Sequence, residues 1–532
     1  MSERHLSAEG SRWAIACPHA AATRGGAEAF EAGGNAVDAA LAAATSLAVV
    51  YPASCGVGGD LFALVRSPDG SIAALNSSGA APAAVDVDAI RAERAGDGAE
   101  HALRMPERGP HTVTVPGAVA GWSELTGLGA RFDLTRALQP AIAFAADGVP
   151  VASDLAGSIS RRIDVWLADP GMAAVFLPDG KLLAEGELLR QPALAETLRT
   201  LANDGPPAMY GGPIGARLAE HLRSLGETHT IEDFEAHSTD VTEPVTRAYR
   251  GVDVSVVPPN SQGVALLEML LAIERLGIEP DATGTDAVTF ANVLRLACLD
   301  RDAHLADPWR VDVPVDDLLG EANINRVARD ATSAAPVAAA PVAGDTVGIV
   351  TADADGWAVS LIQSLYNGFG SGILEPSTGV VLHNRGACFS LDPASPNVIA
   401  GRKRPAHTLM PVLLTRNGNL VGVPGTMGGG GQPQIHAQVL TRSLDLGMSP
   451  ADAVAAPRYV VGGTDSVQGG AFVEAEERVP AETRQALAGA GYRVDVLEPY
   501  DSTVGHTHLI RVGPDGFSAG SDPRADGSAE AG

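Results

Sequence analysis

A stretch of alanine, proline and glycine runs directly into a strand-like segment near residue 345, and this junction constrains the chain more than any other feature. Residues 332–344 (TSAAPVAAAPVAG) lack the large apolar side chains that bury a core, so they are typical of a flexible linker. Residues 346–351 (TVGIVT) are rich in β-branched side chains, and a turn at 353–356 (DADG) separates them from an apolar run at 357–365. The pattern predicts a linker that ends at a β-hairpin.

Thr346 opens this hairpin, and a threonine at that place has a specific chemical use. If the bond between Asp345 and Thr346 were cut, Thr346 would carry a free α-amine beside its own hydroxyl. Such an amine can act as the base that activates the hydroxyl as a nucleophile. The junction alone also fits an ordinary interdomain linker followed by a structural threonine. Motifs elsewhere in the chain are needed to distinguish the two interpretations.

Five glycine-rich or charged motifs occur in a fixed order along the chain. The first is GGNAVDAA at 33–40, which leads through an apolar segment to YPAS at 51–54 and GVGGDLF at 56–62. The other four are FGSGI at 369–373, KRP at 403–405, GGGG at 428–431 and GSDPR at 520–524. Through these motifs the chain resembles the γ-glutamyltransferase superfamily of N-terminal-nucleophile (Ntn) hydrolases over nearly its whole length.

The resemblance implies an α+β fold, a four-layer αββα sandwich made as a proenzyme that cleaves itself between Asp345 and Thr346. Residues 1–345 would form the large subunit, with the flexible linker at 332–345, and residues 346–532 the small subunit. Both would contribute to one interwoven domain. The partners implied are therefore the two subunits and a small-molecule amide, and a dimer of heterodimers is one assembly that the sequence leaves open.

Composition supports an enzyme rather than a nucleic-acid or membrane-binding protein. The 532 residues carry a net charge of −27, which disfavours nucleic acid and anionic membrane as partners. Residues 1–16 lack the apolar core of a signal peptide, and the alanine-rich run 36–50 is too short to span a bilayer. Four scattered cysteines fit a reducing compartment, so we expect a cytoplasmic protein.

The local patterns also predict secondary structure. A hairpin is expected at 61–66 and 71–75, a polar surface loop at 86–110, and mainly helices from 117 to 305 with strands at 241–248 and 252–257. Strands at 411–415 and 420–423 precede a helix at 433–446, and strands at 493–496 and 508–512 are expected to complete a sheet.

The resemblance assigns the catalytic residues. Thr346 matches the nucleophile, and Ser364 falls where the family places a threonine that hydrogen-bonds the nucleophile, although it also fits a plain strand hydroxyl. Gly428 and Gly429 match the glycine pair whose backbone amides form an oxyanion hole before a helix, although the run also fits a tight turn. No metal or cofactor is implied, and His506 and His508 lack a third ligand with suitable spacing.

Three positions depart from the γ-glutamyl pattern. The large-subunit arginine that would hold an α-carboxylate falls near Asp86, the aspartate that would hold an α-amine falls at Cys388, and the family's asparagine falls at Tyr366. Cys388 is interpreted as lining the pocket, since no base can be named that would make it a nucleophile. An α-amino acid would therefore be poorly held, because an unpaired buried charge is costly.

Arg385 is gained where the family usually has Gln or Glu. A guanidinium there could hold a carboxylate through two parallel hydrogen bonds, with Tyr366, His407 and Thr408 completing a small polar pocket. Arg385 could instead form a structural salt bridge. The combination of NRG at 384–386 with RPAHT at 404–408 resembles the oxamate amidohydrolase branch, while KRP at 403–405 fits a structural turn better than a substrate clamp.

The sequence therefore predicts a self-processing amidohydrolase acting on a small carboxylate-bearing amide such as oxamate. Three alternatives remain at this point. They are a γ-glutamyltransferase or glutathione hydrolase with a rearranged pocket, an acylase of a biosynthetic pathway, and an uncleaved pseudoenzyme that serves as a binding protein.

Overall fold

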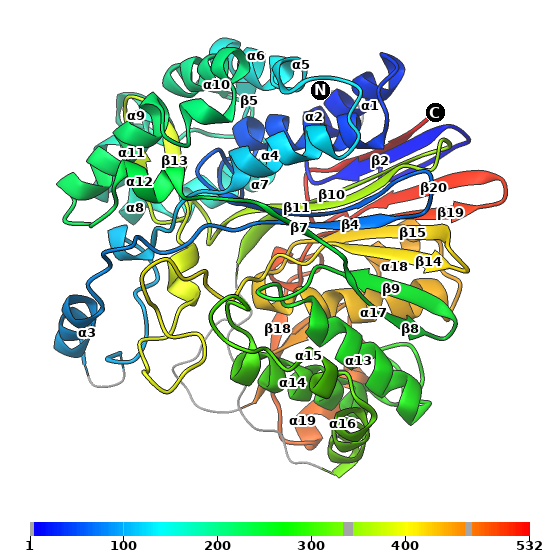
Figure 1. Ribbon diagram of the computed structural model, residues 1–532. Coiled ribbons are helices and arrows are strands. Elements are labelled where there is room, and N and C mark those ends of the chain that lie inside the picture. The colour runs from blue at the N-terminus through cyan, green and yellow to red at the C-terminus, as the bar shows by residue number, and fades with distance from the viewer. Residues whose placement is uncertain (1–4, 99–100, 334–343, 463–470) are drawn as a thin grey trace.

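The computed structural model describes residues 5–98, 101–333, 344–462 and 471–532, in which two seven-stranded sheets lie between outer layers of helices (Figure 1). This arrangement confirms the expected αββα sandwich. Most of the linker expected at 332–345 lies outside the described residues. Its first two residues instead end a helix, α16 (Glu321–Ser333).

The first sheet contains the predicted hairpin at its centre. Its strands, all paired in antiparallel fashion, come from both sides of the bond between Asp345 and Thr346. In spatial order they are β21 (Ser528–Ala531), β2 (Trp13–Cys17), β10 (Asp345–Asp353), β11 (Ala358–Tyr366), β3 (Asp60–Arg66), β4 (Ile72–Ser77) and β7 (Asp240–Thr242).

The second sheet packs face to face against the first. It comprises β1 (Ser7–Gly10), β20 (Gly516–Ser521), β19 (Thr507–Gly513), β15 (Asn419–Thr426), β14 (Val412–Arg416), β9 (Val252–Val256) and β8 (Val245–Tyr249). Alternate side chains of both sheets, such as Phe62, Ile362 and Leu413, are fully buried between them. This dry layer is the apolar burial that holds the two sheets together.

Helices cover the outer faces of both sheets (Figure 1). Every residue of α2 (Ala36–Val50) is buried, and Asn35 with Asp38 forms a capping box at its N-terminus. The helices over the first sheet are α1 (Ala20–Glu31), α2, α4 (Ala118–Gly127), α6 (Gln139–Asp147) and α10 (Pro192–Asp204). Those over the second are α13 (Gly263–Leu276), α14 (Ala287–His304), α16, α17 (Gln432–Leu444), α18 (Pro450–Ala455) and α19 (Ala481–Gly489).

Shorter elements surround this frame. The remaining helices are α3 (Val87–Gly96), α5 (Leu134–Ala137), α7 (Ser153–Ser160), α8 (Ile163–Ala168), α9 (Pro170–Phe176), α11 (Pro213–Ser224), α12 (Ile231–Glu235) and α15 (Val315–Leu318). The remaining strands are β5 (Val149–Pro150), β6 (Leu188–Leu189), β12 (Ile373–Glu375), β13 (Val380–Leu382), β16 (Tyr459–Val461), β17 (Phe472–Glu476) and β18 (Arg493–Leu497). In the described part of the chain, no helix has the length and apolar character needed to cross a bilayer.

Three sequence-based expectations about elements were wrong. The single strand expected at 241–248 is two strands, β7 in the first main sheet and β8 in the second. The segment 86–110 is not a loop throughout, because Asp86 caps the helix α3 and buries Ile90. Strand β18 does not complete a main sheet. It pairs in parallel with β17 in a separate three-stranded sheet, and the second main sheet is instead extended by β20.

Candidate active site

Thr346 lies at an irregular point of the central hairpin. Asp345 pairs with Tyr366 and Val347 with Gln363, so two residues of β11, Ser364 and Leu365, face Thr346 alone. The extra residue makes a β-bulge, a feature that turns side chains out of the regular ladder. Thr346 is 1% exposed, so its hydroxyl is held inside the protein.

One hydroxyl, that of Ser364, organises the junction. The Thr346 hydroxyl donates to Ser364 Oγ at 3.0 Å, and the Ser364 hydroxyl donates to the Asp345 carbonyl oxygen at 2.7 Å. The Tyr366 amide donates to the same Ser364 Oγ at 2.7 Å and fixes it in place. Ser364 thus touches both the expected nucleophile and the carbonyl of the expected cleavage site, and this arrangement favours the functional interpretation over a plain strand hydroxyl.

The glycine run lies against the same junction. A Cβ added to Gly344 would come within 2.8 Å of Gly429 Cα, so the chain just before Asp345 packs directly on the run. Gly428 has a φ of 138° and Gly429 a φ of 52°, conformations that favour glycine. The run leads into the N-terminus of α17, where backbone N–H groups lack helical partners and stabilise negative charge.

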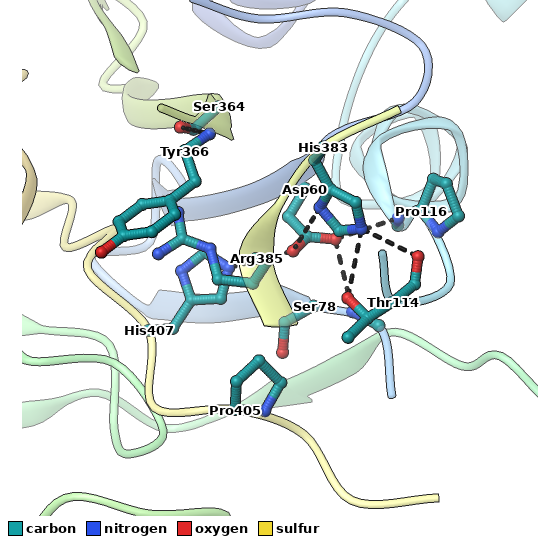
Figure 2. A network of polar contacts seen from close by, with 12 residues as sticks. Asp60, Ser78, Thr114, Pro116, Ser364, Tyr366, His383, Arg385, Pro405 and His407 are labelled. Carbon is teal, nitrogen blue, oxygen red and sulfur yellow. Dashed lines mark hydrogen bonds and ion pairs between the residues drawn. The ribbon is translucent and has the colours of Figure 1, made fainter. Parts of the chain in front are cut away.

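Arg385 is a buried cation, 1% exposed, with unused hydrogen-bonding capacity. Its Nη1 donates to Thr408 Oγ1 at 2.9 Å and approaches Cys388 Sγ at 3.5 Å, while its guanidinium lies 4.3 Å from the centre of the Tyr366 ring (Figure 2). Its Nε and Nη2 atoms are buried without a partner among the described residues. A structural salt bridge, the alternative role for Arg385, is not formed within the described part of the chain.

Tyr366 holds a conformation that is rare for a bulky side chain. Its φ is +79°, which is a strained value for an aromatic residue and is common at functional sites. The Cys388 sulfur, and then burial, raise the pKa of the Tyr366 phenol above its ordinary value, so this group stays neutral beside Arg385. In this backbone conformation the Tyr366 ring lies over the Arg385 guanidinium and the Tyr366 amide donates to Ser364. Tyr366 therefore connects the Arg385 pocket to the hydroxyls of Ser364 and Thr346.

Asp60 is a buried carboxylate with four polar partners, and the sequence interpretation did not single it out (Figure 2). Its Oδ1 accepts from the amides of Gly79 and Gly117, and its Oδ2 lies 3.0 Å from His407 Nε2 and 3.3 Å from His383 Nδ1. Burial alone would raise the pKa of Asp60, but the two facing imidazoles outweigh burial and hold it below its usual range. The sequence did carry one indication of this role, because Asp60 is an acidic residue inside a glycine-rich apolar motif.

His407 contacts the protein through both ring nitrogens. Its Nδ1 accepts from the Leu409 amide at 3.2 Å, and its Nε2 donates to Asp60. Burial, and then the positive charge of Arg385, lower the pKa of His407 to about 3, so the ring is neutral. The direct polar contact with substrate expected for His407 is therefore not supported, because neither nitrogen is available, and His407 instead supports the wall beside Arg385.

The remaining motif residues have structural contacts. Lys403 Nζ donates to the carbonyls of Pro396 and Val398, in agreement with the turn interpretation. Asp86 Oδ1 accepts from the Ala89 amide as the N-cap of α3. Within the described ranges, no group of three potential ligands that could hold a metal includes His506 or His508.

The structure thus brings together most of the residues expected from sequence. They are Asp345, Thr346, Ser364, Tyr366, Arg385, Cys388, Thr408, Gly428 and Gly429, with His407 behind them. A threonine at a β-bulge in one of two facing sheets, preceded by a carbonyl that accepts from a neighbouring hydroxyl, is the arrangement expected of an Ntn-hydrolase proenzyme.

The comparisons with known proteins give the family. A family model described as Gamma-glutamyltranspeptidase matches residues 22–532, and the chain belongs to this family. A relative from Bacillus subtilis (strain 168), "Glutathione hydrolase-like YwrD proenzyme", is 36% identical over 528 residues, 98% of each chain. The "Oxamate amidohydrolase proenzyme" of Klebsiella pneumoniae subsp. pneumoniae is 35% identical over 537 residues, 99% of each chain.

A solved structure agrees with these relatives. The structure of cephalosporin acylase from Bacillus halodurans matches with a TM-score of 0.89 at 33% identity, and the match covers 100% of this chain and 98% of that one. The protein is therefore a hydrolase or acylase of the gamma-glutamyltranspeptidase family. The relatives named above carry names that refer to different substrates.

Proposed function

We propose that this protein is a self-cleaving amidohydrolase that hydrolyses a small amide carrying a carboxylate, with oxamate as the substrate that fits best. The observation that carries the proposal is Arg385, a buried guanidinium whose Nε and Nη2 have no partner in the described structure. An unpaired buried cation is costly, and a bidentate carboxylate ligand would satisfy both atoms.

Self-cleavage comes first in the proposed sequence. The Thr346 hydroxyl attacks the Asp345 carbonyl carbon, which the hydrogen bond from Ser364 polarises, and the acyl group passes from the Thr346 nitrogen to its oxygen. Water then hydrolyses this ester. The products are a large subunit ending at Asp345 and a small subunit beginning with the free amine of Thr346.

The same hydroxyl then acts on the substrate. The Thr346 amine takes the hydroxyl proton as Oγ1 attacks the amide carbon, and amides of the run at Gly428 and Gly429 stabilise the oxyanion. The proton passes to the departing nitrogen, so oxamate releases ammonia and leaves an oxalyl ester on Thr346. Water attacks this ester, releases oxalate and restores the hydroxyl.

Two features favour oxamate over a γ-glutamyl compound. The position expected to carry a carboxylate-binding arginine is Asp86, which caps a helix, and the position expected to bind an α-amine is Cys388, which lies beside the cation of Arg385. An ammonium near Arg385 would be repelled, whereas the carboxylate of oxamate has no such conflict.

The proposal is tested by intact mass and by substrate turnover. Wild type should yield two polypeptides of 345 and 187 residues under denaturing conditions, and Thr346→Ala one uncut chain of 532. Mature enzyme should release ammonia from oxamate faster than it cleaves a γ-glutamyl anilide. Uncut wild type would favour the binding-protein alternative, while preferential γ-glutamyl turnover would refute the substrate assignment.

A further inference from the structure

One buried side chain, Gln262, connects the Arg385 pocket to the glycine run of the proposed oxyanion hole. It precedes α13 and is 1% exposed. Its Nε2 donates to the Thr408 carbonyl at 2.6 Å and to the Gly429 carbonyl at 2.8 Å. Thr408 holds Arg385, and Gly429 belongs to the proposed oxyanion hole, so a single amide group bridges substrate anchor and catalytic backbone.

Arg301 on α14 completes the bridge from the other side. Its Nη1 donates to Gln262 Oε1 at 2.8 Å and to the Gly430 carbonyl at 2.6 Å. Gln262 therefore has both ends of its amide engaged, and two successive carbonyls of the glycine run are held by side chains from the helical layer.

Holding these carbonyls also restricts the backbone next to the proposed oxyanion amides. A peptide unit is planar, so fixing the Gly429 carbonyl fixes the Gly430 N–H, which points the opposite way. The amide of Gly431 donates to the Gly428 carbonyl at 2.8 Å, which fixes the Gly429 N–H in the same manner. A run of four glycines has no side chains to restrict its backbone, so such external bonds are needed to preorganise an oxyanion hole.

We propose that Gln262, held by Arg301, is a positioning residue that fixes the Gly429–Gly430 peptide unit, and through it the adjoining oxyanion amides of Gly428 and Gly429, relative to the Arg385–Thr408 anchor. This inference rests on the proposed function and deepens it. It concerns turnover first, because the hydrogen bonds among Thr346, Ser364 and Asp345 do not involve Gln262.

Gln262→Glu tests the bridge most directly. It keeps the size of the side chain and the acceptor facing Arg301, but it places a carboxylate oxygen against the Thr408 and Gly429 carbonyls. We expect kcat to fall about 100-fold, the effect of a displacement near 1 Å, and KM to rise as the anchor shifts. Arg301→Lys replaces the planar guanidinium by a shorter side chain, which should weaken both bonds made by Nη1 and lower kcat about tenfold. Maturation, followed by intact mass, should be slowed much less than turnover, because Gln262 makes no hydrogen bond to Thr346, Ser364 or Asp345.

Gln438→Leu is the matched control. Gln438 is another fully buried glutamine whose Nε2 donates to a backbone carbonyl, that of Tyr459 at 2.8 Å, and its side-chain hydrogen bonds go to Gln434 and Tyr459, outside the proposed site. This variant should lose stability while kcat and KM per mature enzyme stay at the wild-type values. A double variant of Gln262→Glu with Arg301→Lys should lose less than the product of the two single effects, because both act through one bridge.

The comparison uses the fastest substrate of wild type among oxamate, a γ-glutamyl anilide and a cephalosporin amide. Unchanged kcat and KM in mature Gln262→Glu would overturn the inference, as would a loss of maturation by the same factor as turnover. Wild type that prefers a substrate other than oxamate would overturn the substrate proposal alone.

Discussion

Replacing Arg385 with methionine should separate function from stability. The proposed substrate carboxylate would accept charge-assisted hydrogen bonds from Nε and Nη2, each worth about 1.5–3 kcal/mol. Losing both predicts a fall in kcat/KM of about 10²- to 10⁴-fold, because about 1.4 kcal/mol corresponds to tenfold.

The folded protein should tolerate the same change. In the described part of the chain, two buried donors of Arg385 have no partner. The variant therefore loses one hydrogen bond to Thr408 and the contact with the Tyr366 ring but also removes an uncompensated charge. For 532 residues, about 1 kcal/mol moves Tm by about 1 °C, and we expect Tm to stay within about 2 °C of wild type.

Arg458→Met is the contrasting control. Arg458 is also fully buried, but it pairs with Asp522 at 2.8 Å and donates to three backbone carbonyls. Breaking this buried pair should cost about 3–5 kcal/mol and lower Tm by several degrees.

The assays are steady-state ammonia release from oxamate and thermal denaturation with and without oxalate. A ligand at 100 times its Kd stabilises the native state by about 2.7 kcal/mol, so oxalate should raise the Tm of wild type by about 2–3 °C and leave Arg385→Met unchanged. A drop of several degrees in the Tm of Arg385→Met, with activity lost only in proportion to unfolding, would show that Arg385 is a structural residue.

Further predictions concern maturation, turnover and pH. Ser364→Ala should slow self-cleavage at least about tenfold by removing the bond to the Asp345 carbonyl, while Ser364→Thr should restore it, as followed by intact mass. Equal rates in all three would show that Ser364 is only a strand residue. Gly428→Ala should lower kcat about 100-fold, because the new Cβ would lie 2.4 Å from Ile435 Cδ1 at a φ of 138°. Wild-type kcat in a mature variant would contradict this. Folding stability should fall between about pH 6.5 and pH 3, since His407 stays neutral when folded, with a pKa of about 3, but binds a proton when unfolded. His407 contributes up to about 1.4 kcal/mol per pH unit in this range, and His407→Gln should show a shallower decline in denaturant titrations.

The sequence predicted the hairpin that begins at Asp345–Thr346 well because it depends on local patterns. Alternating and β-branched residues on either side of an Asp-Gly turn specify paired strands, and β10 with β11 lies where these patterns placed it. The segment 86–110 was misassigned because its polar composition hid a short helix whose cap and single buried residue, Ile90, contribute the decisive contacts.

By itself, the sequence determined the family, the fold class and the residues with reactive groups, because motif order and residue chemistry are written along the chain. Tertiary structure alone decided how those residues are used. His407 donates to Asp60, the Arg385 guanidinium has two donors without a partner among the described residues, and Gln262 donates to both Thr408 and Gly429. These outcomes depend on distances between segments more than 100 residues apart, and only the packing of two sheets and their helices fixes such distances.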